Sequence, residues 1–331
     1  MAEYKQIHGT TVQNYTVDPS NPVNGEIWYN STSATLKGFT SNPAGSWASG
    51  GNINTARGQL AGSGIKTAAL VFGGKGPPAG SKKAQTESYD GSAWTEVADL
   101  NTARDSLGGT GTQSSSISMG GSEPAKSAKT ETWDGTSWTE VADLNQARQG
   151  MGAAGADSTT ALCFGGQSVP GGTGLTNTES WDGTSWTEVN DLNEGRYGLG
   201  GSGLKAAALA FSGGSPSPWT LKTSTESWDG TSWSEVNNVN TARDSGGSNG
   251  TQTSALLYGG PSSAPYLTNT ESWDGTSWTE VGNLSTGRYG LAGAGADNTS
   301  ALGAGGYNAP YTAATEEYTS PLTSTVTFST D

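Results

Sequence analysis

The sequence predicts an all-β fold of the propeller type, and three observations support that prediction. An arginine recurs six times at intervals of 44 to 48 residues, each time at the end of a segment of the form Asn-x-x-Arg or Ser-x-x-Arg. Each interval contains four short segments bounded by Gly, Asn, Asp or Ser, which is the pattern of strands joined by turns. The chain also holds 51 Gly and only 32% hydrophobic residues, a composition typical of many tight turns. Four strands in each of several similar units is the organisation of a propeller blade.

Composition and charge exclude several functions for this chain of 331 residues. Its formal net charge of −14 argues against binding to nucleic acid or to an anionic membrane, both of which attract basic surfaces. The single cysteine, Cys163, and the single histidine, His8, allow neither an internal disulfide nor a Cys/His zinc site. Cys163 lies in an apolar run, so we expect it in the core. We expect no membrane span and no secretory signal peptide, because no long apolar stretch occurs.

Residues 1–44 precede the first unit and are expected to form a small β module. The stretch Asn24–Lys37, NGEIWYNSTSATLK, predicts a β-hairpin because two alternating segments flank a turn-forming Asn-Ser-Thr. The last residues, 321–331, alternate apolar with polar side chains. We expect one more strand there, added to a neighbour or to another subunit.

Within each unit the segments keep one order. The arginine is followed by a Gly-rich stretch, an apolar run that ends in Gly-Gly, a variable loop, and a segment such as Glu179–Val189, ESWDGTSWTEV, which recurs verbatim at Glu271–Val281. Asp-Gly between strand-like segments predicts a hairpin turn, in which Asp182 bonds backbone amides and Gly183 adopts a positive φ. We expect the two tryptophans that flank this turn to pack together. The repeated carboxylates are therefore interpreted as structural, because catalysis needs unlike residues that converge on one place.

The units resemble kelch repeats. The resemblance lies in the apolar run, the Gly-Gly pair, the following aromatic residue and a Trp about five residues later, repeated in register over residues 45–320. It implies a six-bladed kelch-like β-propeller. One departure is the turn WDGTSW, which is shorter than the usual kelch connection. The same turn resembles the Asp-box of sialidases, with one residue missing between Asp and Gly.

Closure of the expected ring requires a strand from the N-terminal side. The sixth unit passes through Gly305-Gly306 to Tyr318 and ends without a Trp-containing segment. The missing segment has a counterpart at Gly45-Ser46-Trp47, which precedes the first Asn-x-x-Arg. We therefore expect residues 45–53 to complete the last blade, which leaves no strand edge exposed.

The stretch NGEIWYNSTSATLK resembles short modules of bacteriophage tail fibres and other virion appendages. Together with the kelch-type units, this resemblance implies a non-enzymatic virion protein, a tail-fibre or appendage component that displays the propeller and contacts host surface glycans. Its expected partners are other virion proteins, bound through residues 1–44 and 321–331, and a homo-oligomer is expected in the assembly. Two alternatives remain open, namely a capsid decoration or tail-scaffold subunit, and a bacterial surface or secreted kelch lectin.

A carbohydrate-active enzyme is a weaker hypothesis. The repeats contain Ser and Thr in abundance but no His to activate them, so no nucleophile–base pair is visible. We expect no cofactor and no transition metal, and the sequence leaves calcium bound through oxygen ligands open.

Two sets of residues are candidates for binding. The first set consists of aromatic residues in the variable loops, where rings among Asn, Ser and Thr suit either sugar stacking or packing against other chain segments. Its members are Trp219, Tyr266, Tyr307 and Tyr311. The second set consists of the repeated arginines, which we expect to ring the mouth of a central channel, either as an anion site or hydrogen-bonded to carbonyls of the blades. Its members are Arg57, Arg104, Arg148, Arg196, Arg243 and Arg288.

Overall fold

The computed structural model is an all-β protein that divides into two units. It describes residues 12–20, 25–41, 44–78, 80–168, 173–216, 219–261, 263–320 and 323–328, apart from the side chains at 39–41, 216, 219 and 323–326. The first unit comprises Met1–Ser46 with Ser320–Asp331, and the second comprises Trp47–Thr319. Every regular element within these described ranges is a strand. The same residues contain no helix that is long and apolar enough to cross a membrane.

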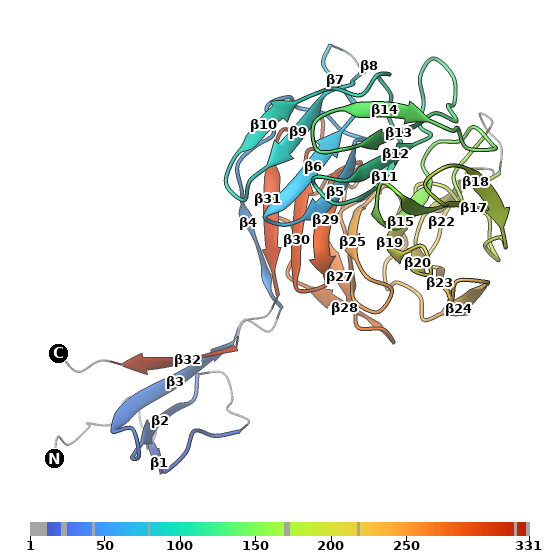
Figure 1. Cartoon of the computed structure of the whole chain (residues 1–331). Helices are drawn as coiled ribbons and strands as arrows, with labels where there is room; N and C mark the ends of the chain where they lie inside the picture. The colour runs from blue at the N-terminus through green and yellow to red at the C-terminus, as the bar shows by residue number, and fades with distance from the viewer. Residues whose placement is uncertain are drawn as a thin grey trace. The chain divides into compact units, whose positions relative to one another are not determined.

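The first unit contains one sheet of four strands in the order β1-β2-β3-β32 (Figure 1). These strands are β1 (Gln13–Tyr15), β2 (Ile27–Asn30), β3 (Thr35–Ser41) and β32 (Thr323–Phe328). β2 and β3 form the antiparallel hairpin expected at Asn24–Lys37, and β1 joins β2 in parallel. β32 pairs antiparallel with β3, so the two ends of the chain meet in one sheet.

Asp18 organises this first unit. Its carboxylate accepts hydrogen bonds from the Trp28 indole at 3.0 Å and the Asn30 amide at 2.7 Å, and it forms an ion pair with Lys37 at 2.6 Å. These bonds, led by the one from Lys37, lower the pKa of Asp18 to about 2. Trp28 is fully buried. The Trp, Asn and Lys of the N-terminal motif are therefore the residues that one carboxylate ties together.

The second unit contains six antiparallel sheets of four strands, called sheets I to VI in the order of their first strands. Sheet I is formed by β5 (Ala61–Ile65), β6 (Ala68–Phe72), β9 (Thr86–Tyr89) and β10 (Trp94–Val97). Sheet II is formed by β11 (Gly108–Gly111), β12 (Ser116–Met119), β13 (Thr130–Trp133) and β14 (Trp138–Val141). Sheet III is formed by β15 (Gly152–Asp157), β16 (Thr160–Phe164), β17 (Thr178–Trp181) and β18 (Trp186–Val189). Sheet IV is formed by β19 (Gly200–Leu204), β20 (Ala207–Phe211), β23 (Thr225–Trp228) and β24 (Trp233–Val236). Sheet V is formed by β25 (Gly247–Gly250), β26 (Ala255–Tyr258), β27 (Thr270–Trp273) and β28 (Trp278–Val281). Sheet VI is formed by β29 (Ala292–Asp297), β30 (Ser300–Ala304), β31 (Thr315–Thr319) and β4 (Ser46–Ser49).

The architecture is propeller-like. The first strand of each sheet contacts the first strands of its neighbours, in the cyclic order β5, β11, β15, β19, β25, β29 and back to β5. Figure 1 shows these strands toward the middle of the unit and the fourth strands, such as β10, β14 and β24, at its periphery. Two-stranded hairpins, β7 (Lys75–Gly76) with β8 (Ser81–Lys82) and β21 (Gly214–Pro216) with β22 (Trp219–Leu221), extend the variable loops of sheets I and IV.

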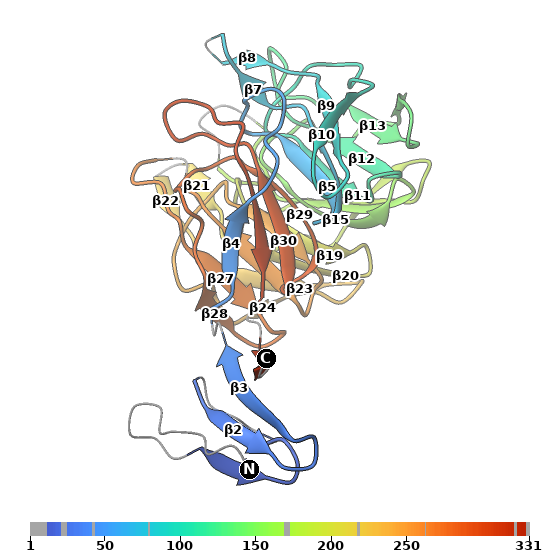
Figure 2. The same cartoon turned by 90° about the vertical axis from the view of Figure 1, so that its left-hand side faces the viewer.

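The sheet that contains the last repeat includes a strand from the start of the second unit. β4, which carries Trp47, is the outermost strand of sheet VI and lies next to β31. Figure 2 shows this blue strand beside the red strands β29 and β30 of the chain's last repeat. The Trp47 ring packs at 4.7 Å from Tyr258 of sheet V and at 5.4 Å from Tyr318 of sheet VI. Trp47 therefore occupies the place that the second Trp holds in other repeats.

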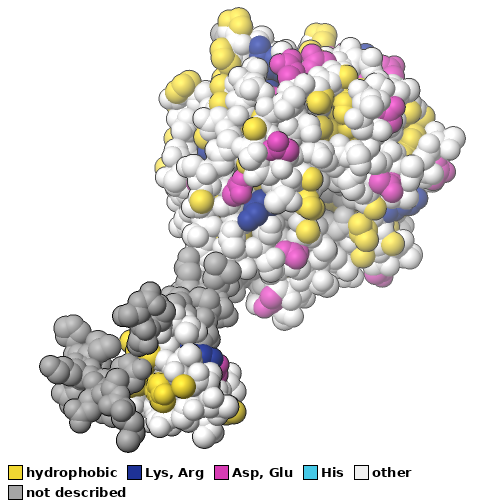
Figure 3. Space-filling view, turned by 60° about the vertical axis from the view of Figure 1, so that its left-hand side comes forward, with side chains coloured by type: hydrophobic (Ala, Val, Ile, Leu, Met, Phe, Trp, Pro, Cys, Tyr) yellow, Lys and Arg dark blue, Asp and Glu magenta, His cyan; other side chains and the backbone are white. Residues whose placement is uncertain are grey.

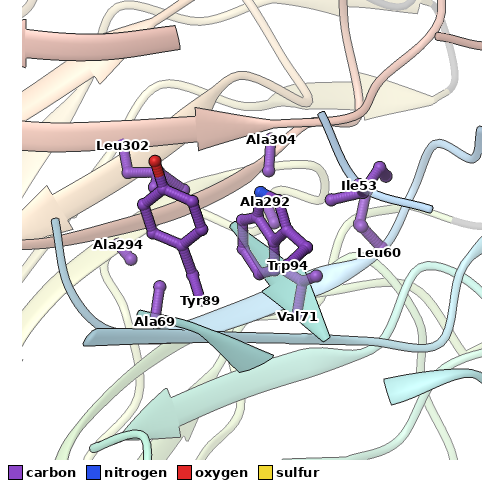
Figure 4. Close-up of a cluster of buried hydrophobic side chains, with 10 residues drawn as sticks. All are labelled: Ile53, Leu60, Ala69, Val71, Tyr89, Trp94, Ala292, Ala294, Leu302 and Ala304. Carbon is purple, nitrogen blue, oxygen red and sulfur yellow. The ribbon is translucent and has the colours of Figure 1, made fainter. Parts of the chain in front are cut away.

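Apolar side chains fill the space between each sheet and the next. Six buried clusters occur, one for each pair of neighbouring sheets, including the pair formed by sheets VI and I. Figure 4 shows this last cluster, in which Tyr89 and Trp94 of sheet I face Leu302 and Ala304 of sheet VI. Cys163 is buried in the cluster between sheets II and III, as expected, and burial raises the pKa of its thiol to about 12.

A tryptophan hydrogen bond links five of the six neighbouring sheet pairs. In each case the Nε1–H of the second Trp of a repeat donates to the hydroxyl of the Thr that begins the third strand of the preceding sheet, at 3.0 to 3.1 Å. The five pairs are Trp47–Thr270, Trp94–Thr315, Trp138–Thr86, Trp186–Thr130 and Trp233–Thr178. The corresponding atoms of the sixth pair, Trp278 Nε1 and Thr225 Oγ1, are buried without a hydrogen-bond partner.

A ring of backbone hydrogen bonds connects all six sheets at one end of their first strands. The residue two positions after each repeated arginine donates its N–H to the carbonyl of the equivalent residue in the preceding sheet, at 2.6 to 2.8 Å. The six members are Gln59, Ser106, Gly150, Gly198, Ser245 and Gly290. All six have φ between 54° and 66°, the left-handed region that glycine adopts most readily. We call this set the backbone ring.

Candidate functional site

The six repeated arginines form buried ion pairs within their own sheets. Each guanidinium contacts the glutamate of the third strand, as Arg148 does with Glu179 at 2.5 Å and Arg104 with Glu131 at 2.9 Å. The remaining pairs are Arg57–Glu87, Arg196–Glu226, Arg243–Glu271 and Arg288–Glu316. All twelve residues are at most 3% exposed. Burial lowers the pKa of five of these arginines, and the paired glutamates oppose that shift.

The Asn-x-x-Arg segment binds both carboxylate oxygens of the same glutamate. Asn145 donates its backbone N–H at 2.7 Å and its side-chain amide at 2.8 Å to Glu179 Oε2, while Arg148 binds Oε1. Arg148 also donates to the carbonyls of Gly165 and Asn177. The glutamate thus anchors the segment that crosses from one sheet into the next.

Burial bears on the two roles considered for these arginines, an anion site and hydrogen bonding to carbonyls. Their side chains are 0 or 1% exposed and are held by glutamate and carbonyl oxygens, so they offer no free positive charge to an anion. The alternative stated for them, hydrogen bonding to carbonyls, is what occurs. The groups that do link the sheets around the centre are the backbone amides of the backbone ring.

The Asp-Gly turns have a local structural role, as the sequence predicts. Asp182 Oδ1 accepts backbone N–H bonds from Thr184 and Ser185, both at 2.8 Å, and Gly183 has φ of 95°. These bonds lower the pKa of Asp182. In the equivalent turn of sheet II, the Thr136 hydroxyl and the backbone N–H groups of Ser137 and Thr136 together lower the pKa of Asp134 to about 2. The flanking rings of Trp181 and Trp186 pack at 5.4 Å. The repeated carboxylates are thus occupied in holding the repeats together.

A cluster of four tyrosines lies on the face formed by the variable loops and the Asn-x-x-Arg segments. Tyr307 is at its centre, with ring centroids 4.9 Å from Tyr311, 5.5 Å from Tyr289 and 6.1 Å from Tyr266. The rings are tilted or edge-on to one another, and all four side chains are half-buried. The structure therefore brings together three of the four aromatic candidates.

Two members of the tyrosine cluster, Tyr289 and Tyr311, have a raised pKa. Burial and the neighbouring tyrosines raise the pKa of Tyr289 to about 12, and burial with Tyr307 raises that of Tyr311. The carboxylates of Asp244 and Asp105 lie close enough to add to these two shifts. The phenols of Tyr289 and Tyr311 are therefore O–H donors set in a negative field, which favours neutral hydroxyl-bearing ligands over anionic ones.

One cluster member, Tyr289, was not among the sequence candidates, and one candidate, Trp219, is not placed in the cluster. Trp219 begins β22, and its side chain lies outside the described part of the chain. Tyr289 follows Arg288 directly and forms a backbone bridge with Tyr307, which directly follows a Gly-Gly pair. The same bridge joins Gly58 to Lys75 and Gln149 to Gln167. This recurrent register is the signal that would have found Tyr289.

Most side chains on the face of the second unit that Figure 3 shows are uncharged. Figure 3 shows acidic side chains scattered over the visible face of the second unit, with fewer basic ones between them. Among the described residues, no three of His, Cys, Asp and Glu gather as a metal site would require. His8 lies outside the described residues.

No protein-family model matches the chain, and no curated protein is found as a relative.

Proposed function

We propose that the protein is a non-enzymatic bacteriophage virion component, a tail-fibre or appendage subunit that displays a closed six-bladed kelch-like propeller and binds a neutral host glycan through its tyrosine cluster. The single observation that carries the binding part is the convergence of Tyr266, Tyr289, Tyr307 and Tyr311 on one loop face. No cofactor takes part in this function.

Closure of the ring is supported by contacts between sheets VI and I. Tyr89 of sheet I donates its hydroxyl to Glu317 of sheet VI at 2.5 Å, and Trp94 donates to Thr315. The backbone ring also returns from sheet VI to sheet I, because Gln59 donates its N–H to the Gly290 carbonyl at 2.6 Å. A closed ring holds its loops in fixed positions, which suits recognition by side chains on those loops.

Glycan binding is supported by the chemistry of the cluster. A tyrosine presents an apolar ring face together with a polar tip, so it can both cover the C–H face of a sugar and bond its hydroxyls. The rings of the cluster are held by one another and by the backbone bridges among Tyr289, Tyr307 and Tyr311. Little side-chain freedom is then lost on binding.

The virion setting is supported by the N-terminal module. Its Trp28, Asn30 and Lys37 are the residues of the stretch that resembles phage appendage modules, and all three contact Asp18. The first unit, which contains both termini, is the part that attaches to other virion proteins in this proposal, and the assembly is a homo-oligomer.

A glycan array probed with the full-length protein tests the binding part. We expect signals for neutral oligosaccharides, weak signals for sialylated ones, and at least a tenfold loss in Tyr307→Ala and Tyr311→Ala. Tyr197→Ala is the matched control, because Tyr197 holds in sheet IV the place that Tyr289 holds in sheet VI. Binding that is absent in the wild type, or equal in all variants, refutes the glycan assignment.

A capsid decoration or tail-scaffold subunit is the second candidate. The observation in its favour is that the repeated Glu, Arg, Asp and Trp side chains are occupied by bonds inside the unit, as suits a rigid spacer. A bacterial surface or secreted kelch lectin would share the tyrosine cluster and differ in where the protein resides.

A further inference from the structure

A cavity lies at the end of the first strands that is remote from the backbone ring. Its volume is about 670 Å³, and the hairpins that join first to second strands in all six sheets line it. In sheet I this hairpin ends at Ala68, where β6 begins, whereas the loop that follows β6 belongs to the face of the tyrosine cluster. We call this cavity the hairpin pocket. Its volume is within the range of small-molecule sites.

The hairpin pocket is built from two similar halves. Sheets I to III and sheets IV to VI repeat one another with an offset of 139 or 140 residues, which pairs Ile65 with Leu204 and Ala156 with Ala296. Thr112 and Gln113 of sheet II pair in the same way with Thr251 and Gln252 of sheet V, and all of these residues line the cavity. Because sheets three places apart face each other across a ring of six, the lining has an approximate twofold axis.

Its chemistry is neutral, with two apolar contacts. No charged side chain lines the cavity. Ile65 is 45% exposed and Leu204 is 51% exposed, and they are the two exposed large hydrophobic residues among the described residues of the second unit. Exposure of large aliphatic side chains only at equivalent points of one cavity marks a contact surface rather than random exposure.

The charged residues next to the lining residues face other groups. Lys205, which follows Leu204, lies close enough to Asp182 to help lower the pKa of that carboxyl. Lys66, which follows Ile65, donates to the Thr319 hydroxyl at 3.1 Å. Asp157 and Asp297, which follow Ala156 and Ala296, accept bonds from residues of their own turns. A charged ligand would therefore be desolvated without a partner, at a large cost in free energy.

We propose that the hairpin pocket binds an uncharged, largely apolar small molecule that contacts Ile65 and Leu204 at once. The amides of Gln113 and Gln252 already donate to carbonyls of the neighbouring sheets, so the aliphatic contacts carry the binding. The site is separate from the tyrosine cluster, and its occupancy does not depend on the glycan or the virion assignment. It rests only on the arrangement of the six hairpins around one cavity.

Fluorescence titration with N-phenyl-1-naphthylamine, an uncharged probe that brightens in apolar sites, tests the proposal. We expect saturable binding to the full-length protein, and about tenfold weaker binding for Ile65→Ser and for Leu204→Ser, because each removes one aliphatic contact. The two effects should agree within about twofold since the halves are equivalent, and the double variant should abolish saturable binding. Both substitutions lie on exposed hairpin positions, so urea unfolding should be unchanged.

Val17→Ser is the matched control, because Val17 is an exposed aliphatic residue of the first unit. It should leave the titration unchanged. Absence of saturable binding by the wild type overturns the proposal, as does equal binding by all variants. A strong effect of only one of the two hairpin variants overturns the two-half arrangement.

Discussion

Replacement of Trp233 by Phe should destabilise the protein more than replacement of Trp278 by Phe. The two tryptophans are 6% and 5% exposed. Each has a partner ring of its own sheet, at 5.3 Å for Trp233 and 5.4 Å for Trp278, and an edge-on Phe of the preceding sheet, at 4.9 Å and 5.0 Å. The two variants therefore lose the same ring volume from similar surroundings. They differ in one hydrogen bond, because Trp233 Nε1 donates to Thr178 at 3.1 Å, whereas Trp278 Nε1 has no partner.

The difference between the two variants isolates that hydrogen bond. A buried neutral bond contributes about 0.5 to 1.5 kcal/mol net, and loss of one partner leaves the Thr178 hydroxyl unsatisfied. We expect Trp233→Phe to lower the free energy of unfolding by about 1 kcal/mol more than Trp278→Phe does. Urea unfolding followed by fluorescence measures both values, and equal m-values show that the same structure unfolds.

A second pair of variants checks the acceptor side. Thr178→Val should cost about 1 kcal/mol, whereas Thr225→Val should be neutral or stabilising, because the Thr225 hydroxyl is buried without a partner. Losses for Trp278→Phe and Thr225→Val that equal those for Trp233→Phe and Thr178→Val would refute the role of this bond.

Three further predictions follow from the same bonds. Glu179→Gln should lower the free energy of unfolding by about 3 to 5 kcal/mol, because it leaves a buried guanidinium without its counter-charge. Glu188→Gln is the control, since Glu188 is exposed and pairs with Glu179 across the strands, and it should change the free energy of unfolding by less than about 0.5 kcal/mol. Similar losses in both variants would contradict the buried-pair interpretation. The native pKa of Asp134 is about 2, below its unfolded value, so the stability that Asp134 contributes is complete above about pH 4 and is lost as the pH falls toward 2. Asp134→Asn should therefore reduce the pH dependence of the urea midpoint between about pH 4 and 2. An unchanged pH dependence would show that the turn bonds do not stabilise the protein. Gly293→Ala should destabilise by about 1 to 3 kcal/mol because its Cβ would overlap the Ser248 carbonyl of the neighbouring sheet; a neutral result in thermal unfolding would mean that the first strands can separate at no cost.

Sequence reasoning finds the sheets because their signals are local. The Asp-Gly turn and the strands on either side of it depend on neighbours within eleven residues, and Asp182 caps its own turn as predicted. The strand that carries Trp47 was also placed from the pattern alone, because the last repeat lacks the segment that Trp47 supplies.

The roles of Arg148 and Trp278 depend on contacts that one repeat does not reveal. An arginine before a Gly-rich strand looks exposed until its glutamate, 31 residues later in the case of Glu179, is placed beside it. Trp186 and Trp278 have the same local sequence, so only the neighbouring sheet distinguishes the bonded Trp from the unbonded one. Tyr289 joins the tyrosine cluster through a register between segments that is visible only once the sheets are formed.

Electron microscopy of whole particles from the source, labelled with gold-conjugated antibody against residues 55–320, tests the central proposal most directly. The account predicts label at the tail or at the tips of the fibres, where a glycan-binding propeller meets the host. Label spread over the capsid shell would contradict the adhesin assignment and favour a decoration subunit. Absence of labelled particles would contradict the virion assignment altogether.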